Sequence, residues 1–286
     1  MDKVILVNKE KGLTSRDVVN IISRKLNTKK VGHFGTLDPL ATGLLVIGTG
    51  ALTKIGNLFS NETKEYEVEV LLGKSTDTYD ITGKILEEKN ISITEEEIKE
   101  ALYSFKGKYN QEVPIYSAVK VNGKKLYEYA RNGKEVTLPK KEVEIIDITF
   151  GKLYEENDNK YFSFKVLVSK GTYIRSLIND LSKKMNIPMC MSNLNRTKCG
   201  AFLLEDSNTL EDIEKNAFKT LDITEVLDIE IREIPENIEN LVLHGTQIDI
   251  ESEKMILFTK DNKYISLYGP YKNKMKPYLT FKKEKN

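Results

Sequence analysis

Apolar residues recur at helical spacing early in the chain and at alternate positions soon afterwards. Residues 18–26 carry apolar side chains three and four positions apart and follow Thr14 and Ser15, either of which can cap a helix. A loop then extends to the next apolar run, at residues 44–47. Residues 65–70 alternate glutamate with an apolar or aromatic residue, which predicts a strand with one face in water.

The middle of the chain contains a helix signature and a hairpin signature. Ser92 or Thr94, each followed by glutamates, opens a capped helix that runs to about Phe105. Residues 142–153 and 161–168 carry strand patterns on either side of a polar Asn-Asp-Asn turn. This arrangement predicts a β-hairpin.

The later part of the chain shows one more helix and two short strands. Gly171-Thr172 is predicted to cap a helix whose apolar stripe spans residues 174–185. Strand-like runs at 254–258 and 264–267 lie on either side of a polar turn. They predict β structure close to the C-terminus.

This mixture of helix and strand patterns predicts a mixed α/β (α+β) fold, with a largely antiparallel sheet flanked by helices. At roughly 150 residues per domain, the 286 residues suggest one large domain, or a large domain and a small one. We expect a catalytic domain over residues 1–220 and a small β-rich module over residues 221–286. With 40% hydrophobic and 30% charged residues, the chain can bury a sizeable core, which excludes a disordered protein.

Cysteine usage, histidine usage and the N-terminal segment bear on location. Cys190 and Cys199 form no CxxC pair, and two histidines are too few for a Cys/His zinc site. We assign His244 and both cysteines structural roles and expect a reducing cytoplasm. The apolar run at residues 4–7 is far shorter than a signal-peptide core or a membrane span of about 20 residues. The expected protein is therefore cytoplasmic and not membrane-inserted.

Charge is unevenly distributed, although 44 Lys and Arg against 43 Asp and Glu exclude a uniformly basic nucleic-acid coat. Residues 104–141 hold nine basic and three acidic residues, with four interleaved tyrosines. Residues 205–239 hold twelve acidic and three basic residues, and residues 272–286 hold six lysines and one glutamate. A basic stretch with aromatic residues can meet a phosphate backbone and unstacked bases. A solvated lysine-rich face would explain residues 104–141 equally well.

The segment 32–43 contains three glycines and one proline, which forbid a regular helix or strand. Such a loop can approach a ligand closely and hold Asp38 at a fixed angle. A phosphate-binding loop is excluded because no Gly-Lys-Ser/Thr follows, and Gly48-Thr49-Gly50 lacks the third glycine of a dinucleotide fingerprint. From its spacing alone, Asp38 is either a turn or helix-cap carboxylate or a catalytic one.

Ordered motifs cover most of the first 200 residues. They are Lys11-Gly12-Leu13-Thr14-Ser15, the loop at 32–43, the segments 64–68, 73–80, 113–118, 123–131 and 170–177, and Leu194-Asn195-Arg196. Through this set the sequence resembles the bacterial tRNA pseudouridine synthase B family, which converts a uridine in the T-loop of tRNA, at tRNA position 55, to pseudouridine. For residues 221–286 the resemblance implies an RNA-binding module similar to the PUA domain.

The resemblance implies three catalytic residues. Asp38 matches the family's nucleophile, the carboxylate that attacks the target nucleotide so that uracil can detach from N1, rotate and reattach through C5. Arg175 matches the arginine that pairs with this carboxylate. Tyr66 matches the aromatic residue that stacks on the target base.

The resemblance also implies substrate-binding residues. His33 matches a residue that helps to extrude and hold the flipped-out nucleotide, and Tyr173 and Leu194 match residues that line the uracil pocket. Stacking on Tyr66 and Tyr173 can return part of the few kcal/mol that unstacking a base costs. Without the resemblance, Tyr66 and Leu194 are core residues, Arg175 is a surface charge and His33 is a turn residue.

The implied isomerisation requires neither a redox change nor an energy source, so no cofactor and no metal is expected. The expected partner is tRNA, held at its T-loop and elbow by residues 104–141 and the C-terminal module, and the expected state is a monomer. A non-catalytic tRNA-binding protein or RNA chaperone could use the same basic surfaces, but the intact set of Asp38, Tyr66 and Arg175 argues against it. A small-molecule acid/base enzyme would not need the basic, tyrosine-rich stretch.

A few residues depart from the family pattern or admit another role. Phe34 stands where the family usually has a small hydroxyl residue, and Glu10 where it commonly has a proline. Asn195 stands where the family often has an arginine before the residue that matches Arg196. These departures affect backbone contacts near the flipped base rather than the nucleophile. Asp77 and Asp80 lie in a Thr-rich, Gly-bounded setting that predicts turn capping.

Overall fold

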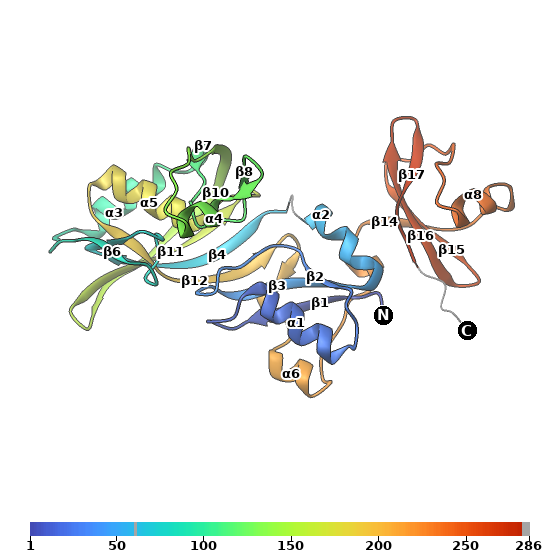
Figure 1. Ribbon diagram of the computed structural model, residues 1–286, viewed down its shortest axis with the longest axis horizontal. Coiled ribbons are helices and arrows are strands. Elements are labelled where there is room, and N and C mark those ends of the chain that lie inside the picture. Colours follow the sequence, from blue (N-terminus) through green and yellow to red (C-terminus); the bar gives the residue numbers. More distant parts are fainter. Residues whose placement is uncertain (60–61, 282–286) are drawn as a thin grey trace.

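The alternating strand patterns assemble into one large sheet, seen in the computed structural model of residues 1–59 and 62–281. Its strands are β1 (Val4–Lys9), β2 (Val31–His33), β3 (Thr42–Thr49), β4 (Lys64–Leu72), β7 (Gly107–Glu112), β10 (Lys140–Glu156), β11 (Asn159–Val168), β12 (Met189–Cys199) and β13 (Phe202–Leu203). The order is β1-β3-β12-β4-β11-β10-β7, with β2 paired to β3 and β13 to β12 (Figure 1). Among the strands described for this sheet, β3 and β12 form the only parallel pair. The mixed α+β fold with a largely antiparallel sheet is therefore confirmed.

Helices and smaller hairpins are attached to this sheet. The helical elements of residues 1–226 are α1 (Ser15–Lys25), η1 (Gly50–Ile55), α2 (Gly56–Phe59), α3 (Glu95–Tyr103), α4 (Leu126–Arg131), α5 (Ile174–Met185), η2 (Leu204–Asp206), α6 (Leu210–Glu214) and α7 (Ile223–Val226). Two short hairpins pair β5 (Lys74–Thr76) with β6 (Ile85–Glu88) and β8 (Lys120–Val121) with β9 (Lys124–Lys125). The apolar faces of α1, α3 and α5 share one core with β4, β10 and β11.

Side-chain caps begin two of the predicted helices. The Thr14 and Thr94 hydroxyls accept hydrogen bonds from the backbone amides of Asp17 and Glu97, and each acidic side chain accepts from the cap residue's amide. Both capping boxes satisfy amides that the first helical turn leaves unpaired. The predicted cap of α5 is wrong. Tyr173 is its N-cap and has no side-chain cap bond, and the adjacent threonine hydroxyl donates to the Ser169 carbonyl instead.

The strand predictions succeed for hairpins and fail for the central strand. The pairing of β10 with β11 confirms the predicted hairpin and extends it at both ends. The stretch expected to be a loop before residue 44 contains β2, which pairs with β3. Strand β12 was not predicted, although it lies between β3 and β4. It therefore links the N-terminal strands to the long hairpin.

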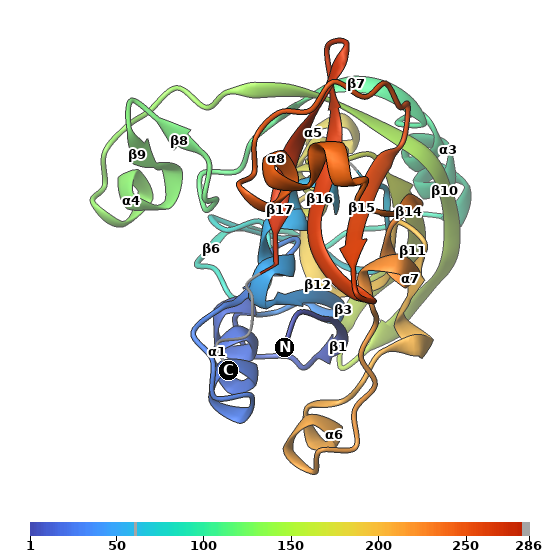
Figure 2. The same cartoon turned by 90° about the vertical axis from the view of Figure 1, so that its right-hand side faces the viewer.

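A second sheet begins within the acidic segment of residues 205–239 and continues after it. It has the order β14-β15-β16-β17, built from β14 (Ile229–Glu233), β15 (Met255–Lys260), β16 (Lys263–Tyr271) and β17 (Lys274–Thr280), with η3 (Glu236–Ile238) and α8 (Glu239–Leu243) beside it. The hairpin of β15 and β16 confirms the strand-like runs predicted there. Figure 2 shows this sheet facing the viewer in front of the larger one.

The two sheets meet through a shared apolar cluster. Leu257 and Leu267 of the second sheet belong to the same buried cluster as Val4 and Leu44 of the first. An ion pair of 2.7 Å joins Lys3 to the acidic segment at Asp222. The division into residues 1–220 and 221–286 stays a prediction, and the last five residues of the basic C-terminal segment lie outside the described part of the chain. Among the described residues, no helix has both the length and the hydropathy needed to cross a membrane.

Candidate active site

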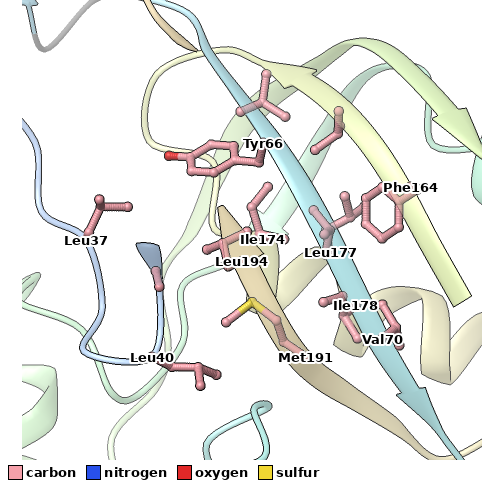
Figure 3. Packing of buried hydrophobic residues seen from close by; sticks show 14 of the residues in the cluster. Leu37, Leu40, Tyr66, Val70, Phe164, Ile174, Leu177, Ile178, Met191 and Leu194 are labelled. Atoms are coloured by element: carbon pink, nitrogen blue, oxygen red, sulfur yellow. The ribbon is translucent and has the colours of Figure 1, made fainter. Parts of the chain in front are cut away.

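The six residues singled out from the sequence lie around one pocket of about 1110 Å³. They come from distant parts of the chain but from neighbouring elements of the sheet and α5. The pocket-lining residues are His33 at the end of β2, Asp38 in the following loop, Tyr66 on β4, Tyr173 and Arg175 at the start of α5, and Leu194 on β12. Figure 3 shows Tyr66, Ile174 and Leu194 grouped beside the segment that carries Leu37 and Leu40.

An ion pair lies in this pocket. The Nε of Arg175 is 2.8 Å from Oδ2 of Asp38, and the two side chains are 6% and 35% exposed. The remaining guanidinium nitrogens of Arg175 donate to the carbonyls of Thr78 and Tyr116, at 3.2 and 3.1 Å. The prediction of a surface charge from residue type alone is therefore wrong for Arg175. The buried guanidinium of Arg175 fixes one carboxylate oxygen of Asp38. The carboxylate group remains partly exposed and faces the pocket.

The loop that carries Asp38 is tied to the structure on both sides of that residue. Ser15 Oγ accepts from the Leu37 amide at 2.9 Å and lies 3.1 Å from the Leu37 carbonyl, to which it donates. The Asp38 carbonyl accepts from the Ala41 amide at 3.1 Å. These bonds hold the loop without regular secondary structure, so the nucleophile candidate has a fixed backbone.

Lys9 is a support of this loop that the sequence analysis missed. It is fully buried at the end of β1, and its Nζ donates to the carbonyls of Leu13 and Glu10 at 2.7 and 2.9 Å and to that of Pro39 at 3.5 Å. Burial lowers the Lys9 pKa to about 8, while the nearby Asp38 carboxylate acts in the opposite direction. A lysine two positions after four apolar strand residues was the available sequence signal.

Tyr66 and Leu194 belong to the core and to the pocket wall at the same time. Tyr66 is 8% exposed, Leu194 is 6% exposed, and both are members of the large apolar cluster. Burial raises the pKa of the Tyr66 hydroxyl, which keeps the ring neutral. A neutral aromatic ring held in the core at one edge can offer its other surface for stacking.

Tyr173 is held through its backbone by a second missed residue, Gln111. The Gln111 side chain is 1% exposed, accepts from the Tyr173 amide at 2.8 Å and donates to the Tyr173 carbonyl at 3.1 Å. Its amide also donates to the Tyr109 hydroxyl at 2.6 Å. This pairing holds the backbone of the N-cap residue and sets the position from which α5 presents Arg175. A glutamine inside a largely polar strand carries no sequence signal of burial.

His33 is half-buried beside the loop. Burial lowers the pKa of His33, and the guanidinium charges of Arg16 and Arg196 act in the same direction. Within residues 1–59 and 62–281, its Nδ1 atom is buried and has no hydrogen-bond partner. The other histidine, His244, lies at the end of α8, where its Nδ1 is 2.7 Å from the Asn240 carbonyl.

The two aspartates interpreted as turn residues do cap turns. Asp80 Oδ1 accepts from the Thr82 amide at 2.9 Å and from the Thr78 hydroxyl at 2.9 Å. Asp77 Oδ1 accepts from the Lys84 amide at 2.8 Å. In the described part of the chain, no group of three or more His, Cys, Asp or Glu side chains is arranged to hold a metal ion.

The two basic segments both reach the pocket rim. Tyr116 and Tyr127 of the segment 104–141 line it, and Lys276 and Tyr278 of β17 line it from the second sheet. The Tyr127 ring has the charged groups of Lys125 and Arg131 each 5.4 Å from its centroid. A cationic and aromatic rim of this kind suits an anionic, base-bearing ligand.

Known proteins resemble this chain in sequence and in fold. Residues 23–174 match the family described as "TruB family pseudouridylate synthase (N terminal domain)". The tRNA pseudouridine synthase B of Mesoplasma florum is 42% identical over 93% of this chain and 92% of its own length. That of Lactobacillus acidophilus is 40% identical over 94% of both chains.

Solved structures share the fold at low identity. A chain in a structure described as "Crystal Structure of a Cbf5-Nop10-Gar1 Complex" covers 98% of this chain with a TM-score of 0.67 and 21% identity, and 84% of its own length is matched. A chain in "Structure of H/ACA RNP bound to a substrate RNA containing 2'-deoxyuridine" gives a TM-score of 0.65 at 19% identity, with 98% and 84% of the two chains covered. These structures show the fold, and the family model and the sequence relatives show that the chain belongs to the TruB family of pseudouridylate synthases.

Proposed function

We propose that the protein is a tRNA-modifying isomerase that converts uridine at position 55, in the T-loop of tRNA, to pseudouridine. The observation that carries this proposal is the ion pair of Asp38 and Arg175, which faces a pocket also lined by Tyr66. Relatives that are about 40% identical are named tRNA pseudouridine synthase B. Family membership supports the reaction, and the Asp38 carboxylate that faces the pocket supports this residue as its nucleophile.

The proposed reaction uses Asp38 as its nucleophile. The carboxylate attacks the target nucleotide, the bond between uracil N1 and ribose C1′ breaks, and the base turns within the pocket. A bond then forms between C5 and C1′, the C5 proton leaves to water, N1 gains a proton and the carboxylate is released. The product is an isomer of the substrate, so the balance requires no oxidant and no energy source.

The neighbouring side chains have matching roles in this proposal. Arg175 orients the Asp38 carboxylate through the 2.8 Å contact and keeps a counter-charge beside it. Tyr66 stacks on the flipped base, and Tyr173 and Leu194 enclose it. His33, whose pKa is lowered by burial, helps to hold the extruded nucleotide. The pocket of about 1110 Å³ exceeds the usual small-ligand range of about 300–1,000 Å³, so it can admit a whole nucleotide.

We infer that the rest of the tRNA lies across the basic rim. Residues 104–141 and the module of residues 221–286, which resembles the PUA domain, would hold the elbow through phosphate contacts and stacking. Lys276 on β17 lies at the pocket rim within that module. Substituting Lys276 by Glu should weaken tRNA binding and reduce its salt dependence. We further propose that the protein acts as a monomer in the cytoplasm.

Release of tritium from uridine C5 of tRNA tests the reaction, because only C5-glycoside formation expels that atom. Wild type and Asp38→Asn would be compared with Asp77→Asn, which makes the same chemical change at a turn aspartate away from the pocket. We expect release by wild type and Asp77→Asn, with the site mapped to the T-loop, and none by Asp38→Asn, which should still bind tRNA. Full release by Asp38→Asn would show that Asp38 is not the nucleophile.

The same experiment separates the competing functions. Tight tRNA binding by wild type without any tritium release would favour a non-catalytic tRNA-binding protein or RNA chaperone. A tRNA affinity that does not respond to salt would favour a small-molecule enzyme, because phosphate contacts release counterions. The intact pocket ion pair favours the isomerase, since a protein that only binds RNA has no need of it.

A further inference from the structure

Arg196, the charged residue of the Leu194-Asn195-Arg196 motif, lies in the middle of the large sheet, on β12. On one side of β12, Arg196 is in register with Tyr66 of β4. On the other side it is in register with Gly43 of β3, directly after the loop that carries Asp38. Arg196 thus lies between β4, which carries Tyr66, and β3, which follows the loop of Asp38.

The guanidinium of Arg196 bonds to both neighbours. Its Nε donates to the Leu44 carbonyl of β3 at 2.7 Å, and its Nη2 donates to the Gly35 carbonyl of the loop at 3.2 Å. The Arg196 charge also acts on the Tyr66 hydroxyl, where it opposes the rise in pKa that burial causes. A planar group with several N–H donors can serve these partners from one side chain.

The charge of Arg196 is buried without a carboxylate partner. The residue is 2% exposed, and among residues 1–59 and 62–281 no ion pair joins it to an acidic side chain. Burying an unpaired cation is costly, and an apolar residue of similar volume would fill the same space. Backbone carbonyls and the Tyr66 phenol offset the cost of burying the Arg196 charge. The contacts of Arg196 therefore hold the backbone of the Asp38 loop and do not neutralise another charge.

The backbone around Arg196 is shaped to make these contacts. The register between β12 and β4 shifts on both sides of the motif, between Met191 and Asn193 and between Arg196 and Lys198. Such bulges re-aim side chains next to functional sites. Between them, Leu194 and Arg196 both face the pocket, which they line together.

We propose that Arg196 is a positioning residue that couples the Asp38 loop to the Tyr66 strand and so sets the separation between nucleophile and stacking ring. The proposal rests on the proposed function, because that separation matters only if a nucleotide lies between the two. Arg196 acts through Gly35, Leu44 and Tyr66 and leaves the attack itself to Asp38. A displacement of about 1 Å in such a site can cost about 10²-fold in rate.

Arg196→Lys, which keeps the charge and loses the fork, tests this role, with Arg196→Gln as a second variant. Arg232→Lys is the matched control, since Arg232 also bonds through Nε and Nη2, to Glu230 on β14 away from the pocket. Two quantities would be measured: the single-turnover rate with saturating enzyme, and backbone hydrogen exchange of residues 34–44. We expect the rate of the Arg196 variants to fall about 10²-fold, with faster exchange in 34–44 and unchanged tRNA affinity. The control should match wild type in both.

Other outcomes would overturn the proposal. An unchanged rate, or unchanged exchange in residues 34–44, would show that Arg196 does not hold the loop. A loss of tRNA affinity with a shallower salt dependence would identify Arg196 as a phosphate contact instead. Failure of both variants to fold would make it a general core residue. If wild type itself makes no pseudouridine, the proposed function fails, while the exchange measurement still tests the coupling because it does not depend on activity.

Discussion

The two partners of the pocket ion pair should contribute unequally to stability. Asp38→Asn removes one charge and leaves Arg175 bonded to the carbonyls of Thr78 and Tyr116. Arg175→Met removes the ion pair and both carbonyl bonds together. Because the carbonyls are held in place by the fold, they lose their donor without relaxing, and the second variant should be the less stable one.

The contacts set the expected sizes. At 2.8 Å, an effective dielectric constant of about 20 gives an attraction of about 6 kcal/mol between the two charges. Desolvation of the buried Arg175 guanidinium opposes most of it, and water screens the 35% exposed Asp38, which leaves about 1–2 kcal/mol. Two charged-group bonds to carbonyls add about 1.5 kcal/mol each. We therefore expect a loss of about 1–2 kcal/mol for Asp38→Asn and about 4 kcal/mol for Arg175→Met.

Urea unfolding followed by far-UV circular dichroism measures both values, since the chain has no tryptophan for fluorescence. Single-turnover tritium release on the same samples measures activity. Asp38→Asn should be nearly as stable as wild type yet inactive, and Arg175→Met should be less stable and slower by about 10²-fold or more. Equal destabilisation by the two substitutions would refute the reasoning, because it would mean that the carbonyl bonds contribute nothing.

Three further substitutions test separate parts of the structure. Burial lowers the His33 pKa below its ordinary value of 6.5. Below pH 6.5 the unfolded chain therefore binds a proton that the folded protein does not, and the free energy of unfolding falls as the pH falls. His33→Asn should flatten this pH dependence in urea titrations. In Gly43→Ala, the new Cβ would lie 2.4 Å from the Arg196 carbonyl oxygen, at a residue with φ +100. This substitution should lower the free energy of unfolding by about 3 kcal/mol. Gly123→Ala, at φ +79 with open space around the new Cβ, should lower it by about 1 kcal/mol. Thr94→Ala removes the α3 cap and should lower the free energy of unfolding by about 1 kcal/mol, measured by thermal unfolding. Because α3 lies away from the pocket lining, a changed turnover rate would contradict a purely structural role for Thr94.

The sequence predicts well where one period and one set of neighbours determine an element. Helices α1 and α3 begin at the predicted threonines because capping boxes are local, and the β10–β11 hairpin is closed by its own turn. The six site residues came from motif resemblance, and the structure places all of them around one pocket. The cap of α5 was mispredicted because the helix begins after Tyr173, whose backbone is held by a buried glutamine from β7, and no local pattern encodes that contact.

Strand β12 escaped prediction for a physical reason. It has neighbours on both sides, so its residues do not alternate simply between core and water, and two register shifts change the phase of the pattern along it. Its parallel pairing with β3 joins residues about 150 positions apart, at Asn195 with Thr42 and Arg196 with Gly43. No window of sequence contains both partners of such a contact.

The buried cations were missed because their partners are backbone carbonyls. Lys9 and Arg196 are bonded to carbonyls of the turn after β1, the Asp38 loop and β3, and a carbonyl has no residue identity that a sequence could reveal. Residue type alone therefore assigns both to the surface. Their burial can be understood only once the loop they support is seen.

This arrangement separates chemistry from RNA binding within one pocket. The supports of Asp38 all come from the larger sheet and its helices: Ser15, Lys9, Arg175 and Arg196 reach it or its loop from α1, β1, α5 and β12. The rim also includes Lys276 from the second sheet, and among the described residues no hydrogen bond or ion pair joins Lys276 to that loop. Changes in β17 should therefore alter tRNA affinity at constant single-turnover rate, while changes at Arg196 should alter the rate at constant affinity. Under the proposed function, the part of the rim that carries Lys276 can therefore be altered separately from the Asp38 loop, because these two parts of the pocket belong to different sheets.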